Sequence, residues 1–170
     1  MKKEAFWAEQ YRQHIGKMVG ACYRYVADWD LAEDLAQDAF LAAMEKASTF
    51  RAFGSFEGWL KKIAINQALM HLRNCPEMVE WDENLHSQEV EDATEDQTVL
   101  QKDFSQEELL DTIGKLPVKQ RTVFNLYAVE HYSHSKIAET LGISVANSKV
   151  LLTRARAELQ QRLKVVAMRR

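Results

Sequence analysis

The sequence contains little cysteine, proline or glycine, and no long hydrophobic run. Its two cysteines, Cys22 and Cys75, lack CxxC spacing, which favours reduced thiols in a cytoplasm over a disulfide. No segment approaches the roughly 18 to 20 apolar residues that span a bilayer, and the charged start MKKEAFWAEQYRQ is not typical of a secretory signal. Two prolines and six glycines in 170 residues leave long stretches uninterrupted, so we expect an all-α protein.

Charge is unevenly distributed along the chain, although the net charge is only −3. Residues 75–108 hold twelve acids and one base, Lys102. Residues 109–170 hold eleven bases and four acids, a net of +7, whereas residues 1–74 carry a net of +1. The total therefore averages an acidic connector with a basic C-terminal segment, and such a basic segment favours DNA as a partner.

The stretch 75–104 lacks apolar periodicity and is rich in acids and amides, so it predicts a flexible linker. We expect it to join two small helical domains, residues 1–74 and residues 105–170. Each domain lies near the lower size limit for a self-sufficient core, and domains of this size often gain stability by docking on a partner.

Three helices are predicted in the N-terminal domain. Asp30 is the expected N-cap of the second, which continues to about Ala47, and Ser55 is the expected N-cap of the third, about 56–73. The first, about 4–27, has apolar residues at three- and four-residue spacing, namely Phe6, Trp7, Tyr11, Ile15, Met18, Val19 and Cys22.

Four helices are predicted in the C-terminal domain. The first, about 105–115, begins with a capping box of Ser105 and Glu108. The second starts at Pro117, a favourable first helical residue, and runs to about Glu130.

The last two predicted helices form a helix-turn-helix. Ser133 caps the first, about 134–141, and the second spans about 145–165. Gly142 stands between them, where the turn needs a residue that tolerates positive φ. The residues expected to face inward are Ile137, Ala138, Leu141, Ile143, Val145, Leu152 and Leu159.

The opposite face of the last helix predicts a surface that enters a DNA major groove. Lys149 and Arg154 can bond guanine or phosphate, Thr153 a base edge or phosphate, and Val150 can pack on a thymine methyl. A helical hairpin with a solvated basic face is the less favoured alternative, because the glycine turn lies in a domain of net charge +7. Ala146 and Asn147 share the predicted face, and Arg121 and Arg156 are expected phosphate contacts or internal salt bridges.

The segment DLAEDLAQDAFLAAMEK, residues 30–46, predicts a helix with one polar face. Acids in a first turn commonly only stabilise the helix dipole, but here the polar face extends past that turn. The residues expected to be buried are Leu31, Leu35, Ala39 and Ala43, and those expected on the polar face are Glu33, Asp34, Gln37 and Asp38.

Aromatic residues alternate with cations just after this helix. Unpaired bases stack on aromatic rings while cations follow the phosphates, so the mixture suits a single nucleic-acid strand. Taken alone, such a pattern is more often core beside a solvated face. Its members are Phe50, Arg51, Phe53, Phe56, Trp59, Lys61 and Lys62.

These stretches together resemble the bacterial extracytoplasmic-function (ECF) sigma factors of the sigma-70 superfamily. DLAEDLAQDAFLAAMEK and SFEGWLKKIAINQALMHLRN are similar to region 2 of that family, and LPVKQRTVFNLYAVEHYSHSKIAETLGIS with KVLLTRARAEL is similar to region 4. With the linker, the resemblance covers essentially the whole chain. It implies a protein that binds core RNA polymerase and directs promoter-specific initiation. The alternative, an autonomous helix-turn-helix regulator that needs no polymerase, does not explain the polar face at 33–38.

The resemblance implies roles for individual residues. Docking on the β′ clamp helices of core polymerase is assigned to Glu33, Asp34, Gln37 and Asp38. Opening of the −10 element and holding of a flipped base are assigned to the neighbourhood of Phe50, Arg51, Phe53, Phe56, Trp59, Lys61, Lys62 and Asn66, with Trp59 also plausible as a structural residue. Recognition of the −35 element is assigned to Asn147, Lys149, Val150, Thr153, Arg154 and Arg121. The core is expected to include Ile63, Ala64, Ala68 and Leu72.

Further partners follow from the resemblance alone. They are the β flap of polymerase, promoter DNA and an anti-sigma factor that covers the docking surfaces, often from the inner membrane; the chain itself is expected in the cytoplasm. Two positions depart from the family pattern. Ser148 stands where a buried valine is usual, which puts the packing under the recognition helix in doubt, and Leu151 replaces a frequent arginine, which predicts a lost phosphate contact.

Enzyme chemistry is not indicated by the sequence. His131 and His134 are three residues apart without further ligands nearby, so no metal site is predicted. A nucleophile with its base, a glycine-rich phosphate loop and a carboxylate pair in an apolar pocket are also missing from the pattern. We therefore expect no cofactor and no small-molecule substrate. The sequence does not define the inducing signal or the target promoters.

Overall fold

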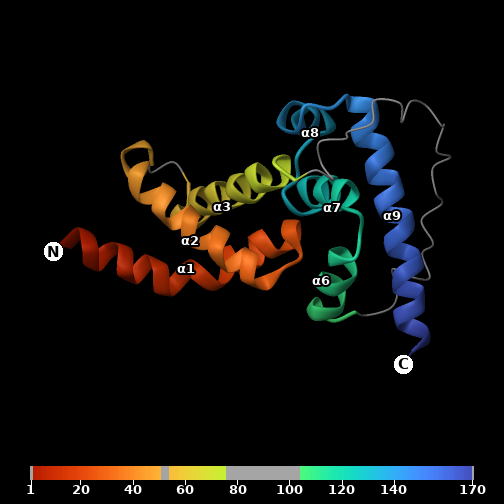
Figure 1. The fold of residues 1–170 in the computed structure, drawn as a ribbon, viewed down its shortest axis with the longest axis horizontal. Helices are drawn as coiled ribbons and strands as arrows, with labels where there is room; N and C mark the ends of the chain where they lie inside the picture. The colour runs from red at the N-terminus through yellow and green to blue at the C-terminus, as the bar shows by residue number, and fades with distance from the viewer. Residues whose placement is uncertain (1, 51–53, 76–103, 170) are drawn as a thin grey trace. The chain divides into compact units, whose positions relative to one another are not determined.

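The computed structural model describes residues 2–50, 54–75 and 104–169 (Figure 1). The chain divides into two compact units, Met1–Pro76 and Glu77–Arg170. Every regular element in the described residues is helical, which confirms the predicted all-α class. Apart from Cys75 and Phe104, the predicted linker lies outside the described residues.

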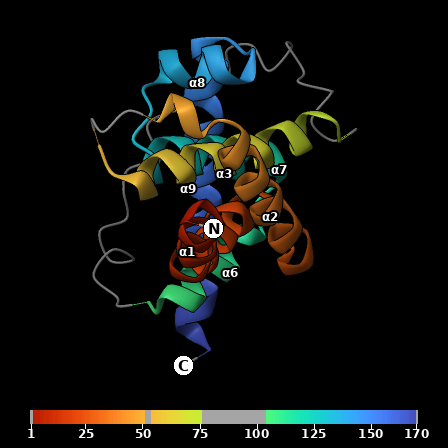
Figure 2. The same cartoon turned by 90° about the vertical axis from the view of Figure 1, so that its left-hand side faces the viewer.

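Unit 1 is a bundle of three helices, α1 (Lys2–Val26), α2 (Trp29–Glu45) and α3 (Phe56–Arg73), with a short 3₁₀ turn η1 (Ala47–Thr49) after α2. Each of the three helices packs against the other two; Figure 2 views α1 nearly along its axis, with α2 and α3 beside it. Small side chains on α2 let its neighbours approach closely, and larger apolar groups of α1 and α3 fill the centre. The core residues include Met18, Cys22, Tyr25, Ala36, Ala39, Phe40, Leu60, Ala64 and Ala68.

The predicted helix starts in unit 1 are partly confirmed. Ser55 caps α3, since its hydroxyl accepts a hydrogen bond of 3.0 Å from the backbone N–H of Gly58. The prediction for α2 was wrong by two residues, because Asp28 rather than Asp30 is the N-cap. Asp28 has extended φ and ψ and accepts from the N–H of Leu31 at 3.2 Å, whereas Asp30 lies within the first turn.

Unit 2 contains α6 (Gln106–Gly114), α7 (Val118–Phe124), the π-helical turn η2 (Asn125–Val129), α8 (His134–Leu141) and α9 (Val145–Met168). Figure 1 shows α9 running the length of the unit, and α6, α7 and α8 all pack against it. The buried residues at its centre include Leu116, Val123, Leu126, Ile137, Leu152, Ala155 and Leu159.

The caps of unit 2 follow the sequence closely. Ser105 and Glu108 form the predicted capping box, Ser133 caps α8, and Gly142 has φ of +68° at the turn. Two details differ. Pro117 is the N-cap of α7 rather than its first helical residue, and the predicted helix 117–130 continues from α7 into the wider π-helical turn η2.

Three predictions about which residues are exposed and which are buried were wrong. Arg121 is only 5% exposed, and its Nη1 donates to the carbonyls of Gly114 at 2.9 Å and Leu116 at 3.3 Å, so it holds the α6–α7 corner. Val145 is 39% exposed because it begins α9 beyond the core. Asn147, predicted on the exposed face, is buried at 9% exposure.

Candidate docking and nucleic-acid surfaces

The polar face of α2 is present as predicted. Glu33, Asp34, Gln37 and Asp38 are all exposed, whereas Leu35, Ala39 and Ala43 are buried and Leu31 is half-buried. Since these four positions are spaced by one, three and four residues, they share one side of the helix. The surface therefore combines three carboxylates and one amide on a rigid element.

A hollow of about 440 Å³ lies beside this polar face, between α1 and α2. At its edge the ring of Trp29 stacks on that of Tyr23, with centroids 3.8 Å apart and planes inclined by 8°. Trp29 is 52% exposed. Sequence reasoning did not select Trp29, although a tryptophan in the first turn of a solvent-facing helix was the available signal. The hollow is lined by Tyr11, Ile15, Gly16, Val19, Trp29, Glu33 and Gln37.

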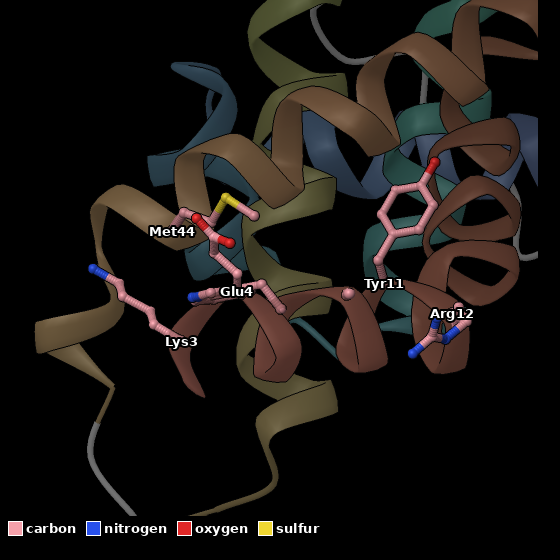
Figure 3. Close-up of a pocket in the computed structure, with 7 residues that line it drawn as sticks. Lys3, Glu4, Tyr11, Arg12 and Met44 are labelled. Carbon is pink, nitrogen blue, oxygen red and sulfur yellow. The ribbon is translucent and has the colours of Figure 1, made fainter. Parts of the chain in front are cut away.

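A second hollow, of about 670 Å³, continues along the same pair of helices (Figure 3). Figure 3 shows Met44 of α2 beside Lys3 and Glu4 of α1, with Tyr11 farther along. Tyr11 lines both hollows, so they share a wall. Tyr11 and Phe6 are exposed although their rings contact Phe40 of α2 at 5.0 Å and Phe56 of α3 at 5.8 Å, respectively. The lining residues are Lys3, Glu4, Trp7, Ala8, Tyr11, Arg12 and Met44.

The predicted aromatic group near the start of α3 is assembled. Phe50, Phe56 and Trp59 lie within 5.3 to 5.6 Å of one another between ring centroids, and Phe56 also contacts Trp7 at 5.9 Å. All three are half-buried, so each ring uses part of its surface in packing. Arg51 and Phe53 lie outside the described residues.

The polar residues predicted beside these rings lie on α3. Lys62 and Asn66 are exposed and one turn apart, and Lys61 is half-buried. The four residues expected in the core, Ile63, Ala64, Ala68 and Leu72, are buried. One side of α3 therefore supports the bundle while another presents a cation and an amide to solvent.

The side of α9 expected to contact DNA exposes fewer residues than the sequence predicted. Lys149 is exposed, while Val150, Thr153 and Arg154 are half-buried. Arg154 lines a hollow of about 500 Å³ together with Lys115 and Lys119 of the α6–α7 corner and Arg162 of α9. Asn147 is buried, and its backbone N–H donates to the hydroxyl of the N-cap Ser144 at 3.0 Å. Leu151, the leucine that replaces a frequent arginine of the family, is buried at 4% exposure.

Ser148, which stands where the family usually has a buried valine, is accommodated in the core by a polar contact. Ser148 is fully buried, and its Oγ lies 2.8 Å from Nδ1 of His134. That histidine was considered as a metal ligand with His131, but the described part of the chain holds no group of three or more His, Cys, Asp or Glu that could hold a metal ion. Both cysteines are free, as expected.

Comparison with known proteins identifies the architecture. The family model for Sigma-70 region 2 matches residues 10–74, and that for Sigma-70 region 4 matches residues 106–159. The chain is an ECF sigma factor of the sigma-70 family. This sigma factor binds core RNA polymerase and directs promoter-specific transcription initiation, and the autonomous regulator is not favoured.

Relatives of this ECF sigma factor cover most of its length. It is 31% identical to the RNA polymerase sigma-H factor of Pseudomonas aeruginosa over 86% of this chain and 80% of that one. It is 30% identical to the ECF sigma factor SigW of Bacillus subtilis, over 87% and 83%.

A solved structure supports the fold. The sigma factor RpoE from Bartonella quintana, crystallised with the anti-sigma factor NepR, matches 93% of this chain and 96% of its own with a TM-score of 0.56 and 21% identity. Among the described residues of the present chain, none of the helices has the length and apolar character needed to cross a membrane.

Proposed function

We propose that this ECF sigma factor docks on the β′ clamp helices of core polymerase through the polar face of α2 and the hollow at Trp29. The observation that carries this proposal is the exposed row of Glu33, Asp34, Gln37 and Asp38 beside a hollow on the same helix pair that is lined by aromatic, aliphatic and polar residues. Interfaces gain most of their affinity from a few buried aromatic or charged anchors surrounded by polar contacts. The α1–α2 surface has that composition.

The two parts of this surface have different tasks. An apolar side chain of the clamp enters the hollow, where Trp29 and Tyr11 supply the contact area. The carboxylates of Glu33, Asp34 and Asp38 then pair with cations around it. Because charge pairs at an interface rim mainly steer association, whereas buried aromatics slow dissociation, both parts are needed for a stable holoenzyme.

We propose that the aromatic group of α3 assists opening of the −10 element. Unpairing and unstacking one base costs a few kcal/mol, and stacking on an aromatic ring returns about 1–3 kcal/mol. Stacking on the half-buried rings of Phe50, Phe56 and Trp59 can therefore offset the free-energy cost of flipping one base, but not the cost of opening the whole transcription bubble. Lys62 and Asn66 are placed on the solvent side of α3 for the strand backbone. The remaining free energy for opening the −10 element must come from contacts that polymerase makes.

Recognition of the −35 element is assigned to the exposed side of α9. Lys149 bonds a base edge or phosphate, Val150 packs on a thymine methyl, and Thr153 bonds a base edge or phosphate. Arg154 lies at the flank of this face, in a hollow with other cations, and is assigned to phosphate. Arg121 and Asn147 are removed from the DNA-contacting set because both are buried. The β flap is the expected polymerase contact of unit 2.

We also propose control by an anti-sigma factor, as in the complex of the Bartonella quintana protein. A partner that fills the α1–α2 hollows would compete with polymerase for Trp29 and Tyr11. This proposal implies that the chain works in the cytoplasm, where core polymerase is found, and that a membrane-anchored partner could hold it at the inner membrane.

The docking proposal is tested by co-purification with core polymerase. Asp34→Ala combined with Gln37→Ala should abolish retention of the chain on immobilised core enzyme. Glu9→Ala combined with Gln13→Ala is the matched control, because this acid and amide are also exposed but bond each other on α1. Equal retention of both double variants and the wild type would reject the α2 surface as the docking site.

A further inference from the structure

One polar contact links the two helices of the helix-turn-helix. His134 is the first residue of α8, and its Nδ1 lies 2.8 Å from Oγ of Ser148 on α9. Ser148 has no exposed surface, while the histidine ring is half-buried. When the neutral ring carries its proton on Nε2, Nδ1 accepts the hydrogen bond from the buried hydroxyl.

The same histidine is tied to α9 by a second route. Its ring stacks on Tyr127 of η2, with centroids 4.8 Å apart and planes inclined by 24°. The Tyr127 ring in turn contacts Arg156 of α9, whose guanidinium lies over it at 5.5 Å from the ring centroid. His134 therefore connects η2, α8 and two positions of α9, Ser148 and Arg156. Those positions bracket Lys149, which is exposed, and Thr153, which is half-buried, along the helix.

We propose that His134 is a positioning residue for −35 recognition. Through its contacts with Ser148 and Tyr127, it fixes the orientation of α9. This inference rests on the proposed role of α9 in reading the −35 element. His134 itself contacts no base in this account. It acts by fixing where Lys149, Val150 and Thr153 stand when α9 enters the groove.

The physical reason lies in the kind of contact. Apolar packing between α8 and α9, which bury Ile137 and Leu152 respectively, is not directional, so by itself it permits small rotations of α9 about its axis. A hydrogen bond weakens steeply as its angle departs from linear, so the His134–Ser148 bond selects one rotation. If the histidine is removed, the buried hydroxyl of Ser148 loses its partner and α9 gains freedom to turn toward another acceptor.

Electrostatics supports the neutral ring that this geometry needs. Desolvation, followed by the nearby charges of Lys149 and Arg156, lowers the pKa of His134 below its ordinary value. The lowered pKa favours the uncharged imidazole, whose Nδ1 accepts from Ser148 when the ring proton is on Nε2.

Selection of promoters from a library tests this inference on the whole holoenzyme. The −35 and −10 elements are randomised, and the sequences held in open complexes are determined for His134→Ala, His134→Asn, Ser148→Ala and the double variant of His134→Ala with Ser148→Ala. Asn can place a polar atom where Nδ1 lies, so it retains the bond to Ser148. Ser135→Ala, at an exposed neighbour on α8, is the control for folding and surface change. Lys149→Ala reports on the proposed function itself.

The expected result is a broader −35 preference for His134→Ala and Ser148→Ala, with discrimination reduced about 5- to 10-fold, the scale of one lost hydrogen bond. The double variant should be no worse than the more affected single variant, and His134→Asn should restore the preference. The −10 preference should be unchanged in all of them. Ser148→Ala removes only one hydroxyl, so it remains informative if His134→Ala fails to fold.

Two results would overturn the inference. One is an unchanged −35 preference in Ser148→Ala and His134→Ala while Lys149→Ala alters it, which leaves the proposed function standing. The other is an equal loss on every sequence without rescue by His134→Asn, which indicates stability alone. If Lys149→Ala also left the −35 preference unchanged, both the positioning role and the assignment of α9 to the −35 element would fail.

Discussion

Trp29 stacks face to face on Tyr23 at 3.8 Å between ring centroids, yet half of its surface remains open to solvent. A large aromatic side chain held rigid by a stacking partner loses little conformational entropy when it binds, which favours its use as an interface anchor. The stack therefore holds Trp29 in a preorganised position for binding at the edge of the α1–α2 hollow.

Replacing this anchor should weaken the holoenzyme. Trp29→Ala is expected to raise the dissociation constant for core polymerase about 30-fold, which corresponds to the roughly 2 kcal/mol of an interface hot spot. Met70→Ala is the matched control, since Met70 is equally exposed but lies on α3. Binding titrations with labelled chain would measure both. Equal affinities of the two variants would show that Trp29 does not lie in the interface.

Arg121 should matter for stability rather than for DNA. It is buried and its guanidinium donates to two backbone carbonyls at the α6–α7 corner, those of Gly114 and Leu116. Arg121→Ala leaves these acceptors without the donor, so we expect a loss of about 2–3 kcal/mol in the free energy of unfolding of unit 2. Urea unfolding followed by circular dichroism would measure it. A wild-type midpoint together with weakened promoter binding would mean that Arg121 contacts phosphate after all.

The two free cysteines should differ sharply in reactivity. Burial raises the pKa of the Cys22 thiol to about 12, and its Sγ donates to the carbonyl of Ala64 at 3.5 Å. Cys75 is half-buried at the end of unit 1. Since the thiolate is the reactive form, a disulfide reagent at pH 8 should modify Cys75 in the folded chain and both thiols in denaturant. Fast labelling of Cys22 in a Cys75→Ser variant would show that the bundle core opens readily.

Acid should destabilise unit 2 through His134. Its pKa is lowered in the folded state, so the unfolded chain binds more protons than the folded one as the pH falls below the ordinary value of 6.5. The contribution of the neutral ring to stability is thus complete above pH 6.5 and is lost progressively below it, down to the folded pKa. Urea unfolding measured from pH 5 to 8 should show that the free energy of unfolding depends less steeply on pH in His134→Asn than in the wild type. Parallel pH profiles would contradict the lowered pKa.

The sequence predicted best what local chemistry determines. Ser55, Ser105, Ser133 and Gly142 were placed correctly, because a cap or a positive φ depends on a few neighbouring residues. The polar side of α2 was equally predictable, since helical spacing alone separates Gln37 from Ala39.

The errors arose where tertiary packing decides. Asp28 and Asp30 are both good N-caps by residue type, and only the backbone of the α1–α2 turn selects Asp28. The burial of Arg121 depends on two carbonyls that become available when the α6–α7 corner forms. The partner of Ser148 is fourteen residues away, on another helix. None of these relations has a period or a motif in the sequence.

The central claim is that the chain acts as a promoter-specificity subunit whose two helical units work only when seated on polymerase. Transcription in vitro with core enzyme on a promoter panel tests it most directly. We expect initiation at a subset of promoters that requires both chain and core, and that disappears with Asp34→Ala plus Gln37→Ala. A chain that directs no initiation on any template, yet binds a duplex operator tightly by itself, would contradict the account.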